Sequence, residues 1–168
     1  MFKKIIIALA FAIALPIVAS AQKFGTVNVE PIIVDMPEYK EMQNQMNEAS
    51  KKYEDEFSKL RDDMQKKYTE FQTLDADPNT PQQIKERRLA EIQESQNKIE
   101  QFRQVASQDL QTKQQQLMAP IEQKVMEAIK AIGQEGGYTF ILPEGVAAYS
   151  GKDVTDVSAQ VRTKLGLK

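Results

Sequence analysis

Residues 38–132 contain no glycine, are rich in Gln, Glu, Lys and Asn, and carry apolar side chains at steps of three and four. A mean step of about 3.5 is typical of a helix with one narrow apolar seam. In the first half of this stretch the apolar positions are Tyr39, Met42, Met46, Ala49, Tyr53, Phe57, Leu60, Met64, Tyr68, Phe71 and Leu74. In the second half they include Ile84, Leu89, Ile92, Ile99, Phe102, Val105, Leu110, Leu117, Ile121, Val125, Ile129 and Ile132. The pattern predicts long helices that bury one stripe each and expose their other faces.

The first predicted helix has a start signal and ends in a turn. Asp35 is followed three residues later by Glu38, and Pro37 lies in the first turn, where proline is tolerated. The helical spacing stops at residues 75–79, Asp-Ala-Asp-Pro-Asn, which are typical of a turn.

The second predicted helix begins directly after that turn. Thr80 suits the N-cap, Pro81 suits the first helical position, and Gln83 completes a capping box with Thr80. Gly133 is a natural C-terminal stop. Pro120 lies inside the helix and, because it lacks a backbone N–H, should kink or interrupt it.

Together these boundaries predict a long antiparallel helical hairpin over residues 38–132, with its turn at residues 75–81. The two arms, of about 36 and 51 residues, would be roughly 55 and 75 Å long at about 1.5 Å per residue. Such arms are much longer than average globular helices, so the hairpin should project into solvent.

The flanking residues 22–37 and 133–168 predict a small β/α body, which makes the fold class mostly α with a small β body. Strands are expected at residues 24–29, 138–142 and 146–149. In the first strand, Val27 and Val29 should lie on the same face.

A final helix should complete the body. Asp153 suits its N-cap, and Asp156 in its first turn is favoured by the helix dipole. Its apolar stripe would be Val154, Val157, Val161 and Leu165. Because three short strands and one helix make too small a core for independent stability, we expect several copies of the chain to share it. The candidate residues of this oligomer body are Val27, Val29, Tyr138, Phe140, Leu142 and Tyr149.

The first 21 residues have the pattern of a secretory signal peptide. Lys3 and Lys4 are positive, residues 5–15 are apolar, and residues 19–21, Ala-Ser-Ala, are small enough for signal peptidase. We expect cleavage before Gln22. The alternative is a membrane anchor, but an apolar run of about 15 residues is shorter than the roughly 20 that span a bilayer.

Composition argues against several classes of function. The chain has no cysteine and no histidine, which excludes disulfides and the Ser-His-Asp and Cys-His catalytic sets. Beyond residue 21 it has 20 basic and 24 acidic side chains, which argues against a general affinity for nucleic acid. Neighbouring acids at residues 54–56 and 62–63 would point in different directions on a helix, so they predict a solvated face rather than a metal site. We expect no enzymatic activity and no cofactor.

Three short motifs carry a likeness to a known family. Residues 23–29, Lys-Phe-Gly-Thr-Val-Asn-Val, and residues 137–142, Gly-Tyr-Thr-Phe-Ile-Leu, have the character of strands. Residues 148–157, Ala-Tyr-Ser-Gly-Lys-Asp-Val-Thr-Asp-Val, combine an Ala-Tyr strand end with a helix start. With the predicted hairpin between them in order and length, the chain beyond residue 21 resembles the Skp/OmpH family of periplasmic chaperones.

The resemblance implies a homotrimer in which strands from three chains form a central β-body. Three helical hairpins would project from it as tentacles around a cavity. Unfolded outer-membrane proteins would be held in that cavity without ATP, in the periplasm. The tentacles of better-known members are strongly basic, whereas residues 51–103 here hold 11 Lys/Arg against 12 Asp/Glu. This near-neutral balance does not favour electrostatic capture of acidic clients, nor contact with a membrane or lipopolysaccharide.

Methionine and aromatic side chains suit a surface that binds varied partners. The candidate client-contacting residues are Met42, Met46, Tyr53, Phe57, Met64, Tyr68, Phe71, Ile92 and Ile99. The same spacing also fits side chains that simply pack between the two helices, in which case clients would meet the edges of the seam. Arg87 and Arg88, near the turn, are candidates for contact with an anion.

A different class of function is also compatible with an exported helical hairpin. The chain could be a structural or adaptor coiled-coil protein of the cell envelope that binds one specific folded partner. A holdase suppresses the aggregation of several unrelated unfolded membrane proteins, whereas an adaptor does not.

Overall fold

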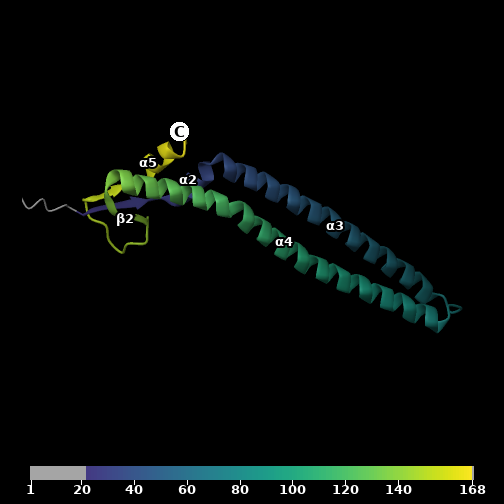
Figure 1. Cartoon of the computed structure of the whole chain (residues 1–168). Coiled ribbons are helices and arrows are strands. Elements are labelled where there is room, and N and C mark those ends of the chain that lie inside the picture. Colours follow the sequence, from purple (N-terminus) through teal and green to yellow (C-terminus); the bar gives the residue numbers. More distant parts are fainter. Residues whose placement is uncertain (1–21, 168) are drawn as a thin grey trace, which may run out of the picture.

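The computed structural model describes residues 22–167 (Figure 1). The expected signal peptide, residues 1–21, lies outside the described residues. The elements in chain order are β1 (Lys23–Val27), α2 (Val29–Asp35), α3 (Pro37–Ala76), α4 (Gln82–Gly136), β2 (Tyr138–Pro143), β3 (Val154–Asp156) and α5 (Ser158–Lys164). The prediction of a mostly helical chain with a small sheet is confirmed.

The helices α3 and α4 dominate the molecule, with 40 and 55 residues. They lie side by side, run in opposite directions and extend away from the other elements (Figure 1). We call α3 and α4 the helix pair. The body comprises the remaining elements together with those ends of α3 and α4 that pack against them. Residues 77–81 join the two helices, and the Asp77 carboxylate accepts a hydrogen bond of 2.9 Å from the Asn79 N–H.

The helix starts differ from the predicted caps. Pro37 is at the start of α3, as expected, but the N-cap is Met36, and Asp35 ends α2 with its carboxylate 2.7 Å from Arg162. The capping box of Thr80 is wrong, because Pro81 is itself the N-cap of α4. With its fixed φ of −59° and extended ψ of 140°, Pro81 shifts the helix start by one residue and leaves no side-chain cap.

The second helix also ends later than predicted. The helix runs continuously through Pro120 and is not interrupted there. It also runs past Gly133 to Gly136, because the left-handed conformation that stops it, with φ 64°, is adopted by Gly137. The Gly137 N–H then donates back to the carbonyls of Gln134 and Gly133.

The sheet has the order β2-β1-β3, and all three strands are parallel. The central strand β1 stops at Val27, and Val29 already belongs to α2, so the prediction that Val27 and Val29 share one strand is wrong. The third strand is β3, not residues 146–149, which form turns and bends. Because β3 pairs with Phe24–Thr26 of β1, the last helix starts only at Ser158, and Asp153 does not cap it.

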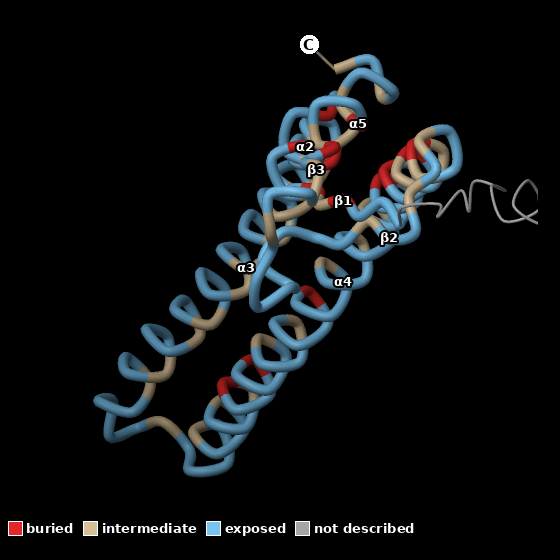
Figure 2. The backbone as a smooth tube through the Cα atoms, turned by 90° about the vertical axis from the view of Figure 1, so that its left-hand side faces the viewer, coloured by how far each residue is buried: buried red, intermediate tan, exposed pale blue. Residues whose placement is uncertain are grey.

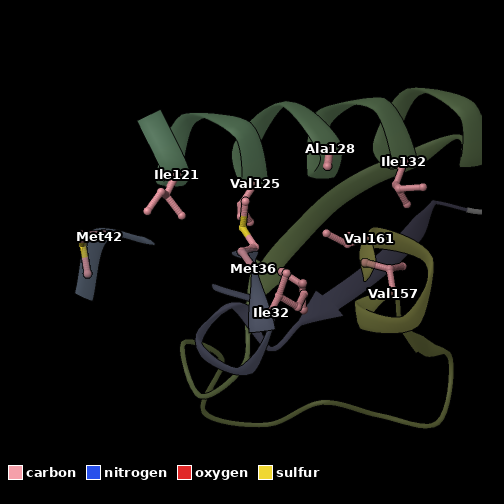
Figure 3. Close-up of a cluster of buried hydrophobic side chains, with 10 residues drawn as sticks. Ile32, Met36, Met42, Ile121, Val125, Ala128, Ile132, Val157 and Val161 are labelled. Carbon is pink, nitrogen blue, oxygen red and sulfur yellow. The ribbon is translucent and has the colours of Figure 1, made fainter. Parts of the chain in front are cut away.

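The core lies in the body, where α2, α4 and α5 meet. Its most deeply buried side chains are Val27, Ile32, Met36, Val125, Val157 and Val161. Figure 3 shows Ile121, Val125, Ala128 and Ile132 of α4 facing this group, and Met42 lies at the end nearest the helix pair. Along the rest of the helix pair the buried positions are few and scattered (Figure 2). Among residues 22–167, no helix is both long enough and apolar enough to cross a membrane.

Candidate binding surface

The contact between α3 and α4 is a thin seam. Beyond the body, its buried residues are Ile92, Ser95 and Ala106, all on α4. The α3 side chains of the seam are half-buried between Met46 and Leu74, except that Tyr68 is exposed. A helix pair packed this lightly leaves much of its apolar surface accessible from the sides.

An aromatic pair bridges the two helices midway along them. The ring centroids of Tyr53 on α3 and Phe102 on α4 lie 5.9 Å apart, and the rings are tilted by 57°. The Tyr53 hydroxyl donates a hydrogen bond to the carboxylate of Asp109 on α4. That hydrogen bond, assisted by burial and by the negative charge of Asp109, raises the pKa of Tyr53. Tyr53 therefore stays a neutral donor and is anchored at its outer end.

Two grooves flank the Tyr53–Phe102 pair, one on each side of the helix pair. The larger, which we call the apolar groove, has a volume of about 950 Å³. The apolar groove is lined by Tyr53, Phe57, Phe102, Ala106 and Leu110, with Glu54, Glu100, Arg103 and several Ser and Gln residues around them. The smaller, which we call the charged groove, has a volume of about 610 Å³. The charged groove is lined by Glu48, Lys52, Glu56, Asp109 and Lys113, together with Gln45, Ala49 and the two rings. The larger groove is therefore lined by more large apolar residues and fewer charged residues than the smaller one.

The candidate client-contacting residues fall into three groups. Met42 and Ile92 are buried, and Met46 packs partly against the body core, so these three offer little surface. Tyr53 and Phe57 line the apolar groove. Phe57 and Met64 also line a smaller hollow of about 510 Å³ on α3. Tyr68 is exposed, and Phe71 and Ile99 are half-buried.

Residues of the apolar groove also come from outside the candidate set. Phe102 and Leu110 belong to the predicted seam but not to the predicted contacts, and Ala106 belongs to neither. Asp109, which lines the charged groove, was not predicted either. A signal for Ala106 is present in the sequence, since Phe102, Ala106 and Leu110 are four residues apart and lie on one helix face. The small side chain of Ala106 leaves room between its two large neighbours.

The candidate anion contacts have a partner close by. Arg87 and Arg88 both donate to the carboxylate of Glu91, at 3.0 Å and 2.6 Å. The hydrogen bond with Glu91 raises the pKa of Arg88, and the hydrogen bond from Arg88 is the main cause that lowers the pKa of Glu91. An anion at this place would therefore compete with an internal carboxylate.

The predicted acidic clusters point to solvent. Asp63 forms an ion pair of 2.6 Å with Lys67, and the hydrogen bond from Lys67 lowers the pKa of Asp63. Within the part of the chain that the structure describes, no three acidic side chains come close enough to hold a metal ion.

The outward face of the sheet is apolar and uncovered. Phe24 and Phe140 are paired in register and stack with centroids 6.3 Å apart and planes 9° apart. Phe140 is 61 % exposed, and Leu142 beside it is exposed as well. Tyr149 in the following loop is 85 % exposed.

The other candidates for the oligomer body are not on this outward face. Val27 is buried in the core, and Val29 and Tyr138 pack partly against it. The outward apolar face thus consists of Phe24, Phe140 and Leu142, and Phe24 was not among the predicted residues.

Comparison with known proteins places the sequence in a family. The family model described as outer membrane protein (OmpH-like) matches residues 23–165. Chaperone protein Skp of Yersinia enterocolitica is 27 % identical over 166 residues, covering 95 % of this chain and 99 % of its own. Chaperone protein Skp of Photorhabdus luminescens is 27 % identical over 159 residues, covering 91 % of this chain and 94 % of its own. Because the match includes the flanks and the whole helix pair, the expected relationship is confirmed, and this chain belongs to the Skp/OmpH family of OmpH-like outer membrane proteins.

Proposed function

We propose that this protein is an ATP-independent periplasmic holdase that binds unfolded outer-membrane proteins between projecting helix pairs. The observation that carries the proposal is the thin seam of α3 and α4, which leaves the apolar groove and Tyr68 accessible on two helices of 40 and 55 residues. The relatives named chaperone protein Skp support the same conclusion. The proposal involves binding alone, with no reaction and no cofactor.

The proposed assembly is a homotrimer. In it, residues 22–37 and 133–168 form the shared body, and residues 38–132 of each chain form a hairpin that projects as one wall of a cavity. The outward apolar face of Phe24, Phe140 and Leu142 supports this arrangement, because exposed apolar surface gathered in one place is typical of an interface. Tyr149 and Val146 extend the exposed apolar surface into the loop that follows β2.

The proposed compartment is the periplasm, reached after cleavage before Gln22. The positive, apolar and small-residue segments of residues 1–21 support this step.

The experiment that tests the proposed function is suppression of aggregation without nucleotide. Several unrelated β-barrel membrane proteins would be diluted from urea into buffer containing the mature protein, and light scattering would be followed. We expect suppression for all of them, reaching a plateau near one assembly per client. Suppression of none, or of a single one, would favour the structural or adaptor protein that binds one folded partner.

A further inference from the structure

We propose that the apolar groove receives an aromatic or aliphatic side chain from an extended segment of the unfolded client, with a Lys or Arg next to it in the client sequence. This inference rests on the proposed function and assigns it a specific place on the helix pair, on the side that holds Phe57 and Leu110 rather than on the side that holds Lys52 and Lys113.

The lining of the apolar groove suits an apolar side chain. Phe57, Phe102 and Leu110 supply large apolar surfaces from both helices, and Ala106 is buried between them as a small floor residue. Large apolar side chains that converge from two helices can take an apolar group from water, although Ser, Gln and charged residues complete the lining here. An aromatic side chain placed there would lose part of the about 150–250 Å² of surface that complete burial removes from water.

The length of the apolar groove suits an extended segment. Its lining spans residues 50–57 on α3 and residues 100–111 on α4, which corresponds to roughly 10 to 16 Å of helix at about 1.5 Å per residue. At about 3.3 Å per residue, this length holds roughly three to five residues of extended chain. Strands of β-barrel membrane proteins alternate apolar and polar side chains, so one face of such a segment can enter the groove while the other stays in solvent.

The charges at the edge of the apolar groove determine which client residue is favoured next to the inserted side chain. Arg103 lies 3.6 Å from Glu100, so these two opposite charges offset each other. Glu54, on the α3 edge, forms no ion pair within residues 22–167. The edge therefore has one uncompensated negative charge, which favours a basic residue beside the inserted side chain and disfavours an acidic one.

Asp109 acts as a positioning residue for the apolar groove. It lines the charged groove on the opposite side, and its hydrogen bond holds the outer end of Tyr53 there. The Tyr53 ring is a wall of both grooves, so a ring released from Asp109 can turn toward the open space beside Phe57 and Leu110. The bond to Asp109 keeps that space free.

The test uses the mature protein and synthetic peptides as probes. The first peptide alternates Ser with Tyr and Phe and has one Lys beside its central Phe; a second has Glu in place of that Lys. Binding is measured by fluorescence anisotropy. Ser107→Trp places a large side chain in the apolar groove, and Thr112→Trp places the same side chain on an exposed position that lines neither groove.

We expect Ser107→Trp to weaken binding of the Lys peptide by about tenfold, and Thr112→Trp to change it less than about twofold. The Lys peptide should bind more tightly than the Glu peptide, and Glu54→Gln should reduce that preference. Asp109→Leu should weaken binding, whereas Asp109→Asn, whose amide oxygen still accepts a hydrogen bond, should restore it. Circular dichroism of each variant checks that the helix pair is intact.

Two results would overturn the proposal: equal weakening by both tryptophan variants, or equal binding of the two peptides. If either occurs while the unchanged protein still suppresses aggregation of unfolded β-barrel proteins, the groove assignment fails and the proposed function stands. If the unchanged protein suppresses no aggregation, the proposed function fails independently of the peptide results.

Discussion

Asp156, Ser158 and Asn28 form a short hydrogen-bonded chain that ties the last helix to the central strand. The Asn28 N–H donates to the Ser158 hydroxyl oxygen at 2.8 Å. The Ser158 hydroxyl and N–H in turn donate to the Asp156 carboxylate at 2.5 Å and 2.9 Å. The hydroxyl and then the N–H of Ser158 lower the pKa of Asp156, because both bonds favour the charged carboxylate. These hydrogen bonds hold α5 and the buried Val157 and Val161 against the end of β1.

We predict that Asp156→Ala lowers the free energy of unfolding at pH 7 by about 1 kcal/mol, the usual net contribution of an intramolecular hydrogen bond. The pKa of Asp156 is lower in the folded state than its ordinary value of 3.8. Its contribution to the free energy of unfolding is therefore complete above pH 3.8 and is lost as the pH falls through the folded-state pKa. Urea unfolding followed by circular dichroism at several pH values measures this.

Asp153→Ala is the matched control for Asp156→Ala. Asp153 is exposed and lies in the turn just before β3, and it does not cap α5. Its removal should change the free energy of unfolding by less than about 0.5 kcal/mol. A pH-independent loss in Asp156→Ala, or an equal loss in Asp153→Ala, would contradict the role given to the Asp156 carboxylate.

The long helices could be predicted because their signal is local. Apolar side chains at steps of three and four, without glycine, specify a helix wherever its partner lies. The third strand could not be predicted, because β3 is defined by its pairing with Phe24–Thr26, more than a hundred residues earlier. Residues 146–149 have strand-forming side chains, but no strand in the described residues pairs with them.

The candidate surface was predictable only in part, for a related reason. The seam positions follow from spacing along each helix, and Tyr53 and Phe57 were found that way. Which α4 residues lie opposite them depends on the register between the helices, to which the bond of 2.9 Å from Lys67 to the buried Ser95 contributes. The bond from Tyr53 to Asp109, and hence the position of the Tyr53 ring between the two grooves, follows from that register.

Along the helix pair, we predict that stability decreases from the body toward the turn. The core residues lie in the body, and few buried side chains hold α3 to α4 beyond it. Local opening should therefore require least free energy near the turn, so amide hydrogen exchange should be fastest at residues 60–89. Mass spectrometry of exchanged, digested protein measures this. Uniform protection along both helices would contradict a pair that opens locally and would favour a rigid adaptor.

The charge balance of the helix pair predicts weak dependence on salt. Residues 51–103 hold 11 Lys/Arg and 12 Asp/Glu, so long-range attraction of a charged client should be small. Surface charges are screened over about 8 Å at physiological ionic strength, whereas apolar burial is not weakened this way. Client affinity should change little between low and high salt, and replacing both Arg87 and Arg88 by Gln should have a modest effect because Glu91 already pairs with them. A decrease of orders of magnitude with salt would contradict apolar capture.

For the molecule as a whole, the outward face of the sheet is the proposed interface between chains. We predict that Phe140→Asp breaks the assembly into monomers, because a charge buried in an apolar contact costs several kcal/mol (roughly 3–5) when it has no partner. Val105→Asp is the matched control, since Val105 on the helix pair is 61 % exposed, the same fraction as Phe140. Analytical ultracentrifugation distinguishes the two variants. Monomers in both, or in neither, would contradict this interface.

In the proposed assembly, a shared body carries projecting helix pairs that hold an unfolded client. Native mass spectrometry of the mature protein, with and without an unfolded β-barrel membrane protein, tests this most directly because it reports the number of chains and clients together. We predict an assembly of three chains alone, and the same three chains with one client after mixing. A single chain, or an assembly that binds the folded barrel but not the unfolded one, would contradict the account.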